Sequence, residues 1–465
     1  MVSIEARPSA DHRLDFVDQA MFLGLRATGQ AAVTQIAWVY DHPVDMEEVR
    51  RFHRDFGYGL AGRLIEPSAL PFGRHRWVAS PGPAAPLAIE SSPRPRSELS
   101  DWIDERAQLP IDPEFGPGWH AGVLPMTDGS TAVTLVMSHL LFDGGAALST
   151  IHDAIRGHRR DFGYPPPRTR TRRQAMAADA RQTLRDAPEL GRTLVAAAKF
   201  LMSHRKDGSA RDTKDRSSAS PAQPTGRSGR RAADDEAVVV PAVSAFIALD
   251  EWDARAEALG GNSYSLLAGF AAKLAVDQGR ELVADGTVGL IVPINDRAPD
   301  DTRANAVALA QVRVDPRLIT TDLSSTRAVV RDALKAVKDE PDEAMRLLPL
   351  TPFIPKFAVR RVADLAIGFA EQPVSCSNLG DLPIGIACLD GTPAEQVFLR
   401  GVDRHITRRV LEERHGLLTI VSGRLDGKVS IAVIGYQPGV ENTKEGLRAR
   451  VARVLGEFDL RGVIV

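Results

Sequence analysis

Residues 131–147, TAVTLVMSHLLFDGGAA, decide the fold because they set a polar turn between two regular elements. The first seven residues form a largely apolar run, which predicts a buried strand. Beyond the glycines, Leu148, Ile151 and Ile155 recur at helical spacing, which predicts a helix. The turn SHLLFDGG is therefore expected just past the end of a strand.

Strands and helices are predicted on both sides of this unit. An N-terminal β-then-α pair precedes it, and the second half of the chain repeats the mixture, so the pattern indicates an α/β protein. The further predicted elements are strands at 33–40, 288–293 and 307–314, helices behind Asp45 and Asn262, a hairpin turning at Asp426–Gly427, and a last helix opened by Asn442 with Glu445 in a capping box.

The length of 465 residues predicts two domains, because one hydrophobic core rarely serves so long a chain. We place an N-terminal half at 1–165, a basic helix with a flexible linker at 166–240, and a C-terminal half at 241–465. The linker assignment depends on residues 203–236, which contain almost no large apolar side chains. A short apolar helix with basic ends is expected over residues 188–206.

The net charge of −2 and the pI near 6.6 give no global attraction to nucleic acid or to an anionic membrane. Cys376 and Cys388 are too few for a disulfide framework and are expected to be reduced and buried. The N-terminus lacks a signal-peptide core, so a cytoplasmic protein is expected. The helix at 188–206 either packs on the first domain or makes a weak, peripheral contact with a membrane or lipid surface.

Several common catalytic motifs do not occur: the sequence has no GxxxxGK[ST] phosphate loop, no HExxH, no GxSxG and no GxGxxG after a strand. What remains is His139 with Asp143 four residues on, followed by Gly144 and Gly145. A histidine can accept and return a proton at neutral pH without a metal. It therefore suits acyl transfer, in which a base removes the acceptor's proton as the acceptor attacks a thioester carbonyl.

The residues alone leave the roles of this turn open. Asp143 either faces the imidazole or turns away to an arginine and fixes the turn, and the glycines permit a tight backbone and close approach of a ligand chain. The bland alternative is a core histidine bonded to a carbonyl, with Asp143 as a plain helix cap.

The string HLLFDGG resembles the HxxxDG signature of the chloramphenicol-acetyltransferase-like superfamily, which includes nonribosomal peptide condensation domains. The chain is most similar to the wax ester synthase/diacylglycerol acyltransferases. That similarity extends over nearly the whole chain through LDFVDQAMFLGL, GPGWHAGVLP, GGNSYSLLAGFAAKLA, VPINDR and SNLGDLP, which occur in the family's order.

The resemblance implies two similar α/β domains, each a mixed sheet with helices, facing each other across a tunnel with His139 at its middle. It implies acyl-CoA as co-substrate, a small alcohol, sugar or amine as acceptor, direct transfer without an acyl-enzyme, and no bound cofactor or metal. Two departures put the substrate in doubt: Ser138 replaces a histidine of HHxxxDG, and Ser263 replaces the aspartate of an Asn-Asp pair.

Four supporting residues have a structural and a functional interpretation. Arg297 is either a surface cation or the partner of Asp143 from the other domain. Asn262 is either a helix cap or a substrate contact. Ser377 and Asn378 either stabilise a turn or, for Asn378 or a nearby N–H, donate to the oxyanion. Basic residues either belong to a solvated linker or bind CoA phosphates or an acidic carrier protein: Arg168, Arg170, Arg172, Arg173, Arg227, Arg230 and Arg231.

Three functions follow from these observations. The first is an acyl-CoA-dependent O- or N-acyltransferase with His139 as general base. The second is a condensation-type enzyme that takes its acyl group from a carrier-protein thioester. The third is a binding or scaffold relative that has lost catalysis. Acyl chain length, acceptor identity and oligomeric state are not encoded in any motif of the sequence.

Overall fold

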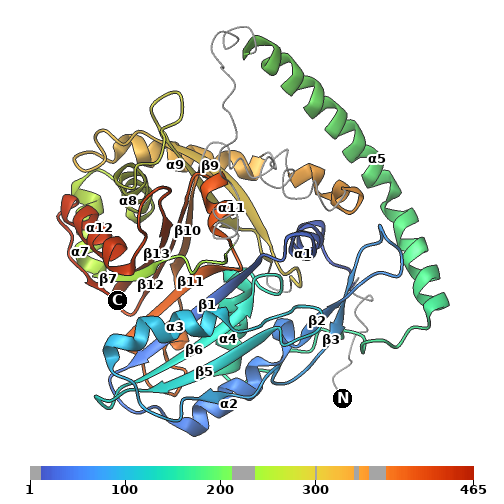
Figure 1. Cartoon of the computed structure of the whole chain (residues 1–465), viewed down its shortest axis with the longest axis horizontal. Helices are drawn as coiled ribbons and strands as arrows, with labels where there is room; N and C mark the ends of the chain where they lie inside the picture. The colour runs from blue at the N-terminus through green and yellow to red at the C-terminus, as the bar shows by residue number, and fades with distance from the viewer. Residues whose placement is uncertain (1–11, 212–235, 299–300, 340–344, 355–372) are drawn as a thin grey trace, which may run out of the picture.

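The computed structural model describes residues 12–211, 236–298, 301–339, 345–354 and 373–465 of the chain. Their strands form two large sheets, each flanked by helices, so the molecule has two lobes (Figure 1). This arrangement confirms the predicted α/β class with mixed sheets. The division at residues 165 and 241 stays a prediction.

The sheet of the first lobe has five strands in the order β11-β1-β6-β5-β4, and a separate small hairpin pairs β2 with β3. Only the pairing of β4 with β5 is parallel within the large sheet. The strands are β1 (Ala31–Tyr40), β2 (Arg63–Glu66), β3 (Arg76–Ala79), β4 (Ala88–Ile89), β5 (Trp119–Pro125), β6 (Thr131–Ser138) and β11 (Gln396–Arg404).

The sheet of the second lobe has seven strands in the order β14-β7-β13-β12-β10-β8-β9. Strand β10 runs parallel to both of its neighbours, and the other pairs are antiparallel. The strands are β7 (Ala242–Ala248), β8 (Val288–Asn295), β9 (Val307–Val314), β10 (Val374–Asp381), β12 (Leu417–Leu425), β13 (Lys428–Tyr436) and β14 (Val463–Ile464).

Helices cover both sheets. Three of them begin at side-chain caps that the sequence predicts, because Asp45, Asp143 and Asn262 each accept a backbone N–H of the following turn. The helices are α1 (Phe16–Thr28), α2 (Met46–Phe56), η1 (Gly59–Ala61), η2 (Arg96–Glu98), α3 (Leu99–Gln108), α4 (Gly144–Ile155), α5 (Arg172–Arg211), α7 (Leu249–Ala258), α8 (Ser263–Asp277), α9 (Ser324–Asp339), η3 (Met345–Phe353), η5 (Ile384–Ala387), α11 (Arg408–Glu413) and α12 (Lys444–Glu457).

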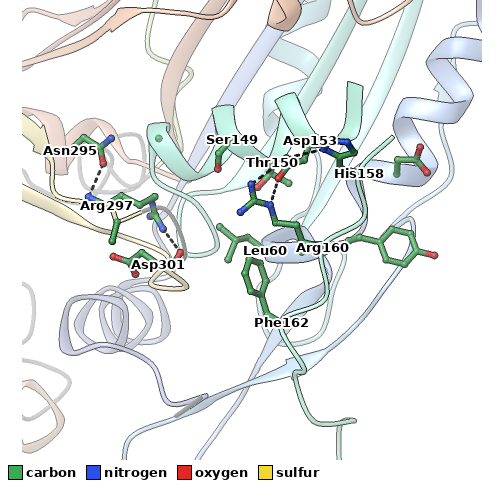
Figure 2. A pocket seen from close by; sticks show the side chains of 15 residues that line it. Leu60, Ser149, Thr150, Asp153, His158, Arg160, Phe162, Asn295, Arg297 and Asp301 are labelled. Carbon is green, nitrogen blue, oxygen red and sulfur yellow. Dashed lines mark hydrogen bonds and ion pairs between the residues drawn. The ribbon is translucent and has the colours of Figure 1, made fainter. Parts of the chain in front are cut away.

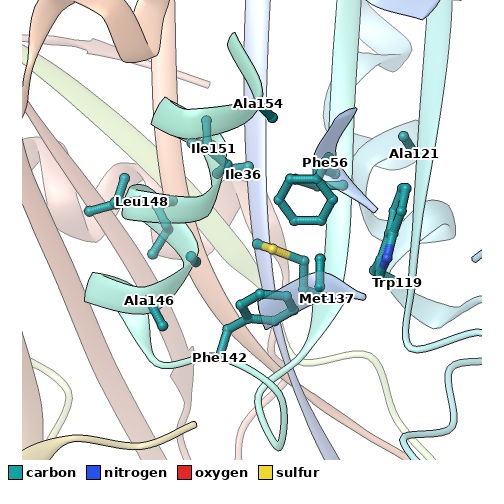
Figure 3. Close-up of a cluster of buried hydrophobic side chains, with 14 of the residues drawn as sticks. Ile36, Phe56, Trp119, Ala121, Met137, Phe142, Ala146, Leu148, Ile151 and Ala154 are labelled. Carbon is teal, nitrogen blue, oxygen red and sulfur yellow. The ribbon is translucent and has the colours of Figure 1, made fainter. Parts of the chain in front are cut away.

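The core of the first lobe holds the decisive turn in place. Helix α4 packs on β1 and β6 through the stripe that the sequence predicts, and Phe142 of the turn enters the same cluster (Figure 3). The ring of Phe56 lies 4.8 Å from that of Trp119 and 5.9 Å from that of Phe142, centroid to centroid. Burying three such aromatic side chains anchors the turn at the end of β6.

The second lobe has its own core between its sheet and helices α8 and α12. The predicted stripes are buried on both helices, from Leu266 to Leu274 and from Leu447 to Leu455. The predicted cap of α12 is wrong by one residue: Thr443 accepts the N–H of Gly446, whereas Asn442 bonds back to the backbone of residues 437 and 440.

Strand β11 lies in the predicted C-terminal half of the chain but completes the sheet of the first lobe. It pairs with β1 from Ala31↔Arg404 to Val39↔Gln396. Side chains of the preceding segment, including Ile386 and Leu389, also enter the first core. The first lobe is therefore completed by a strand from the C-terminal half of the sequence, whereas every strand of the second sheet comes from that half itself.

Two sequence predictions about the connection between the lobes are corrected. The helix expected over 188–206 is a part of α5, whose 40 residues run along one side of the molecule (Figure 1). Residues 203–211, assigned to the linker, also belong to this helix. Residues 212–235 lie outside the described part, as do the side chains of 194–211, so the choice between packing and a lipid contact stays open.

Two further findings concern predictions from composition. Both cysteines are free, but only Cys376 is buried, and Cys388 is half-exposed, contrary to expectation. A search of the helices in the described ranges finds none that combines the length and the apolar character needed to cross a membrane.

Candidate active site

His139 follows β6 directly, where the sheet of the first lobe ends. Its N–H donates to Ala32 O at 3.0 Å, which extends the pairing of β1 and β6 by one residue, and its own carbonyl accepts from Asn305 Nδ2 at 3.3 Å. Its backbone is therefore held from both lobes. The residue as a whole is partly exposed, but Nδ1 of its ring is a buried atom without a hydrogen-bond partner among the described residues.

Ser138 shapes the turn that carries His139. Its carbonyl accepts the N–H of Leu141 at 2.9 Å, and its hydroxyl accepts that of Leu140 at 3.3 Å. Ser138 itself is buried. The replacement of the first histidine of the motif therefore places a turn-forming side chain beside the candidate base.

Asp143 turns away from the imidazole and joins the two lobes. One carboxylate oxygen caps α4 by accepting Ala146 N at 2.7 Å. The other accepts Ala306 N at 2.8 Å and Arg297 Nη2 at 2.8 Å. The predicted ion pair with Arg297 is thus present, and its side chains are only 2% and 9% exposed. A buried carboxylate that accepts three hydrogen bonds, one of them from a guanidinium, holds the turn in one position.

Arg297 gathers a loop of the second lobe around the motif. Its guanidinium donates to the carbonyls of Asp301, Arg303 and Ala304 at 3.1, 2.8 and 3.0 Å. Ala304 O in turn accepts the N–H of Asp143 at 2.9 Å. The loop that ends at residue 306 is therefore shaped by Arg297 and fastened to Asp143 at three points.

Asp18 provides a second buried link between α1 and the same loop. Its carboxylate accepts Ala304 N at 2.9 Å, Asn305 N at 2.9 Å and Asn305 Nδ2 at 3.0 Å. Burial raises the pKa of Asp18 to about 6, although these hydrogen bonds and the nearby charge of Arg63 oppose the rise. Asn305 thus connects Asp18 to the carbonyl of His139.

Arg63 is a further residue of this network that the sequence reasoning missed. It is fully buried, and it donates to Thr302 O at 2.5 Å, Leu141 O at 3.2 Å and Tyr164 Oη at 2.8 Å. An arginine that binds carbonyls on both sides of the lobe interface fixes their separation. No local sequence motif identifies Arg63 or Asn305 as part of the site. Asp18 could have been noticed, because it is an acidic residue within the mainly apolar segment LDFVDQAMFL.

The two glycines of the motif allow the second lobe to approach α4 closely. A Cβ at Gly144 would lie 2.9 Å from Leu379 Cδ2, and one at Gly145 would lie 3.4 Å from the side-chain amide of Asn295. The close approach seen here is that of β10 and β8 of the protein itself, whereas the expected approach of a ligand chain stays a prediction.

A cavity of about 260 Å³ lies between the lobes, next to the contact of Gly145 with Asn295 (Figure 2). Asn295 and Arg297 line it from the second lobe, and Ser149 and Asp153 line it from α4. Gly145 and Arg297 join it to the motif, but His139 is not among its lining residues. The expected tunnel past the imidazole stays a prediction.

The remaining candidates differ in their surroundings. Asn378 Oδ1 accepts Gly380 N at 2.9 Å, so its amide group is the end left to donate, and neighbouring Ser377 lies on the same strand, β10. Asn262 forms a capping box with Ser265 and lines a different cavity with Tyr264. The structure thus supports the capping interpretation of Asn262, and the oxyanion role of Asn378 stays a prediction.

The basic residues considered as phosphate ligands are partly engaged elsewhere. Arg170 forms ion pairs with Asp179 at 3.0 Å and with Glu66 at 3.3 Å, which fasten the start of α5 to the first lobe. Arg227, Arg230 and Arg231 lie outside the described residues.

Asp403 on β11 is a charged neighbour of His139 that the sequence reasoning did not select. It is half-buried, and burial raises the pKa of its carboxyl, while the charges of Arg414 and His139 oppose that rise. Nothing in the sequence indicates that residues 139 and 403 are close, because they come near each other only when β11 joins the sheet of the first lobe.

Comparison with solved structures places this architecture among known folds. The first condensation domain of the CDA synthetase superposes with a TM-score of 0.57 at 13% identity, covering 98% of this chain and 100% of that one. The wax ester synthase/diacylglycerol acyltransferase from Marinobacter aquaeolei VT8 gives 0.54 at 15% identity, covering 96% and 98%. The chain has the condensation-domain fold.

The condensation-domain fold is thus shared over the full length of both neighbours, which confirms the predicted two-lobed architecture. No family model and no curated protein matches the sequence. At 13–15% identity the likeness concerns the fold, and the chemistry must be argued from the residues themselves.

Proposed function

We propose that this protein is an acyltransferase that moves an acyl group from a thioester to a hydroxyl or amine, with His139 as general base. The observation that carries the proposal is the division of labour within the HxxxDG turn. Asp143 is committed to Arg297 and Ala306, whereas His139 is a partly exposed residue at the strand end. The turn therefore fixes the backbone of His139 without using its side chain as a structural bond.

The reaction that suits this arrangement is direct transfer. The imidazole takes the acceptor's proton as the acceptor oxygen or nitrogen forms a bond to the thioester carbonyl carbon. The tetrahedral intermediate then collapses, the C–S bond breaks, and the imidazolium returns the proton to the departing thiolate. A donor such as Asn378 or a nearby backbone N–H would stabilise the oxyanion. No covalent acyl-enzyme is needed, because the motif supplies a base.

The acyl donor is proposed to be acyl-CoA, used as a co-substrate, with an alcohol, sugar or amine as acceptor. A carrier-protein thioester is the second candidate, and the condensation domain of the CDA synthetase favours it, since that neighbour superposes as well as the wax ester synthase does. A weak peripheral contact with lipid would fit a wax-ester-synthase-like member. A binding relative without catalysis is the third candidate.

The test is a screen of acyl-CoAs and carrier-loaded thioesters against alcohols, sugars and amines, read out as release of free thiol. We expect His139→Ala to keep the fold and to lose roughly 10²–10⁴-fold in rate, the usual contribution of a general base. His42→Ala, in the loop after β1, is the matched control and should retain full activity.

Each outcome selects one reading. Comparable rates in wild type and His139→Ala would refute the general-base proposal. Turnover only with carrier-loaded thioesters would identify a condensation-type enzyme. Absence of thiol release with every donor and acceptor would favour the binding relative.

A further inference from the structure

Asp403 lies level with His139 in the sheet of the first lobe. In the register of β1 with β11, Ala32 stands opposite Asp403. In the register of β1 with β6, Val33 stands opposite Ser138, and the bond from His139 N to Ala32 O continues that pairing. The three residues thus form one row across three strands.

Residues in one row of an antiparallel sheet place their side chains on the same face. Four residues further along each strand, Leu135, Ile36 and Leu399 all belong to the core beneath α4. Because the alternation has a period of two, His139 and Asp403 project from that same face, toward the second lobe. They are not separated by the sheet.

The residue between them is small. Strands lie about 4.8 Å apart, so the Cα atoms of His139 and Asp403 are about 10 Å apart across Ala32. An alanine methyl leaves the space above it to the two longer side chains. Burial raises the pKa of the Asp403 carboxyl, and the charges of Arg414 and His139 oppose that rise.

The sheet face beside this row is open. Thr34 stands opposite Gly401 two residues further along, and a Cβ added at Gly401 would meet no atom of the described residues within 4 Å. His139, Ala32 and Asp403 are all partly exposed. A molecule that lies over Gly401 would therefore touch the row that carries both the imidazole and the carboxylate.

We propose that Asp403 is a positioning residue for His139, whose negative charge stabilises the imidazolium formed when His139 takes the acceptor's proton. This inference rests on the proposed function. Asp403 takes no part in the proton transfer itself: the proton moves from the acceptor to His139 and then to the thiolate. A negative charge near the ring favours its protonated form by direct attraction. Asp403 supplies this negative charge. Asp143 does not, because its carboxylate is paired with Arg297.

The other charged groups around the pair are accounted for. Arg414, at the end of α11, acts on Asp403 and favours its ionised form. The negative charge of Asp143 is balanced by Arg297. The carboxylate of Asp18 accepts hydrogen bonds from the N–H groups of residues 304 and 305. Asp403 is therefore the carboxylate whose charge reaches the imidazole from the open face.

The test compares Asp403→Asn, Asp403→Glu and wild type. We expect Asp403→Asn to lower kcat about tenfold, less than loss of the base itself, with KM for the thioester nearly unchanged. The acidic limb of its pH–rate profile should move to lower pH, because the neutral amide no longer favours the imidazolium. Asp403→Glu should restore part of kcat and return the limb toward its original position.

Asp315→Asn is the matched control, since Asp315 follows β9 in the second lobe and bonds to Arg317. It should leave kcat and the profile unchanged. A merely structural role for Asp403 would lower the melting temperature without moving the acidic limb, and that result would overturn the proposal, as would an unaltered kcat and profile.

NMR titration of the His139 ring separates this inference from the proposed function, with the signal assigned through His139→Gln. A midpoint that falls in Asp403→Asn supports the positioning role even if the wild type transfers no acyl group. A midpoint that stays unchanged overturns the role even if acyl transfer is confirmed.

Discussion

Helices α4 and α8 begin in the same way and yet have different importance. Asp143 and Asn262 are both N-caps that accept an N–H three residues on, at 2.7 and 3.0 Å. The side-chain hydrogen bonds of Asn262 stay within Asn262–Ser265, whereas the second oxygen of Asp143 reaches Arg297 and Ala306 in the other lobe. The comparison shows that a helix cap becomes part of a functional site when its side chain also bonds to residues far away in the sequence.

The largest effect is expected for Asp143→Ala. The substitution leaves the buried guanidinium of Arg297 without its carboxylate and removes the cap of α4, so the free energy of unfolding should fall by about 3–5 kcal/mol. Urea denaturation measures it, and acyl transfer should be lost with the position of the turn. The double variant with Arg297→Ala should lose less than the sum of the single losses. Additive losses would mean that the ion pair does not couple the lobes.

An intermediate effect, dependent on pH, is expected for Asp18, which joins α1 to the same loop without an arginine bonded to it. Its pKa is raised to about 6, so its stabilising contribution is complete below about pH 4 and is lost as the pH rises through 6. The full change is on the order of 3 kcal/mol. We expect the unfolding free energy of the wild type to fall relative to Asp18→Asn over this range, as measured by urea titrations at each pH. A constant difference between the two would contradict the raised pKa.

The smallest effect is expected for Asn262→Ala. Loss of a local cap should lower the unfolding free energy by about 1 kcal/mol. Thiol release per folded molecule should match that of the wild type, because the bonds of Asn262 serve α8 alone. A large fall in kcat with normal stability would show instead that Asn262 contacts substrate, and the contrast between the two helices would disappear.

The sequence was sufficient for elements whose causes are local. The strand before His139, the caps at Asp45, Asp143 and Asn262, and the hairpin at Asp426, where φ is positive, all follow from neighbouring residues. The pairing of Asp143 with Arg297, across 154 residues, was one of two alternatives because an arginine at a strand end has no local reason to choose a partner.

Other features had no local cause to detect. The strand character of VFLRGVDR does not say which sheet it joins, so the row of His139 and Asp403 was hidden. Asn305 and Asp18 are 287 residues apart and meet through packing alone. The length of α5 was a different kind of error: residues 203–211 contain almost no large apolar side chains and were therefore assigned to the linker, but they continue the helix that precedes them.

Strand β11 comes late in the chain but belongs to the sheet of the first lobe. Its position therefore also affects the order in which the molecule can fold on the ribosome. When residues 1–165 have emerged, strands β1, β4, β5 and β6 are available, but one edge of β1 has no partner until Arg404 has been synthesised. An unpaired strand edge invites association with other chains. The nascent first lobe must therefore wait for more than half of the polypeptide before its sheet is closed and His139 acquires its full surroundings.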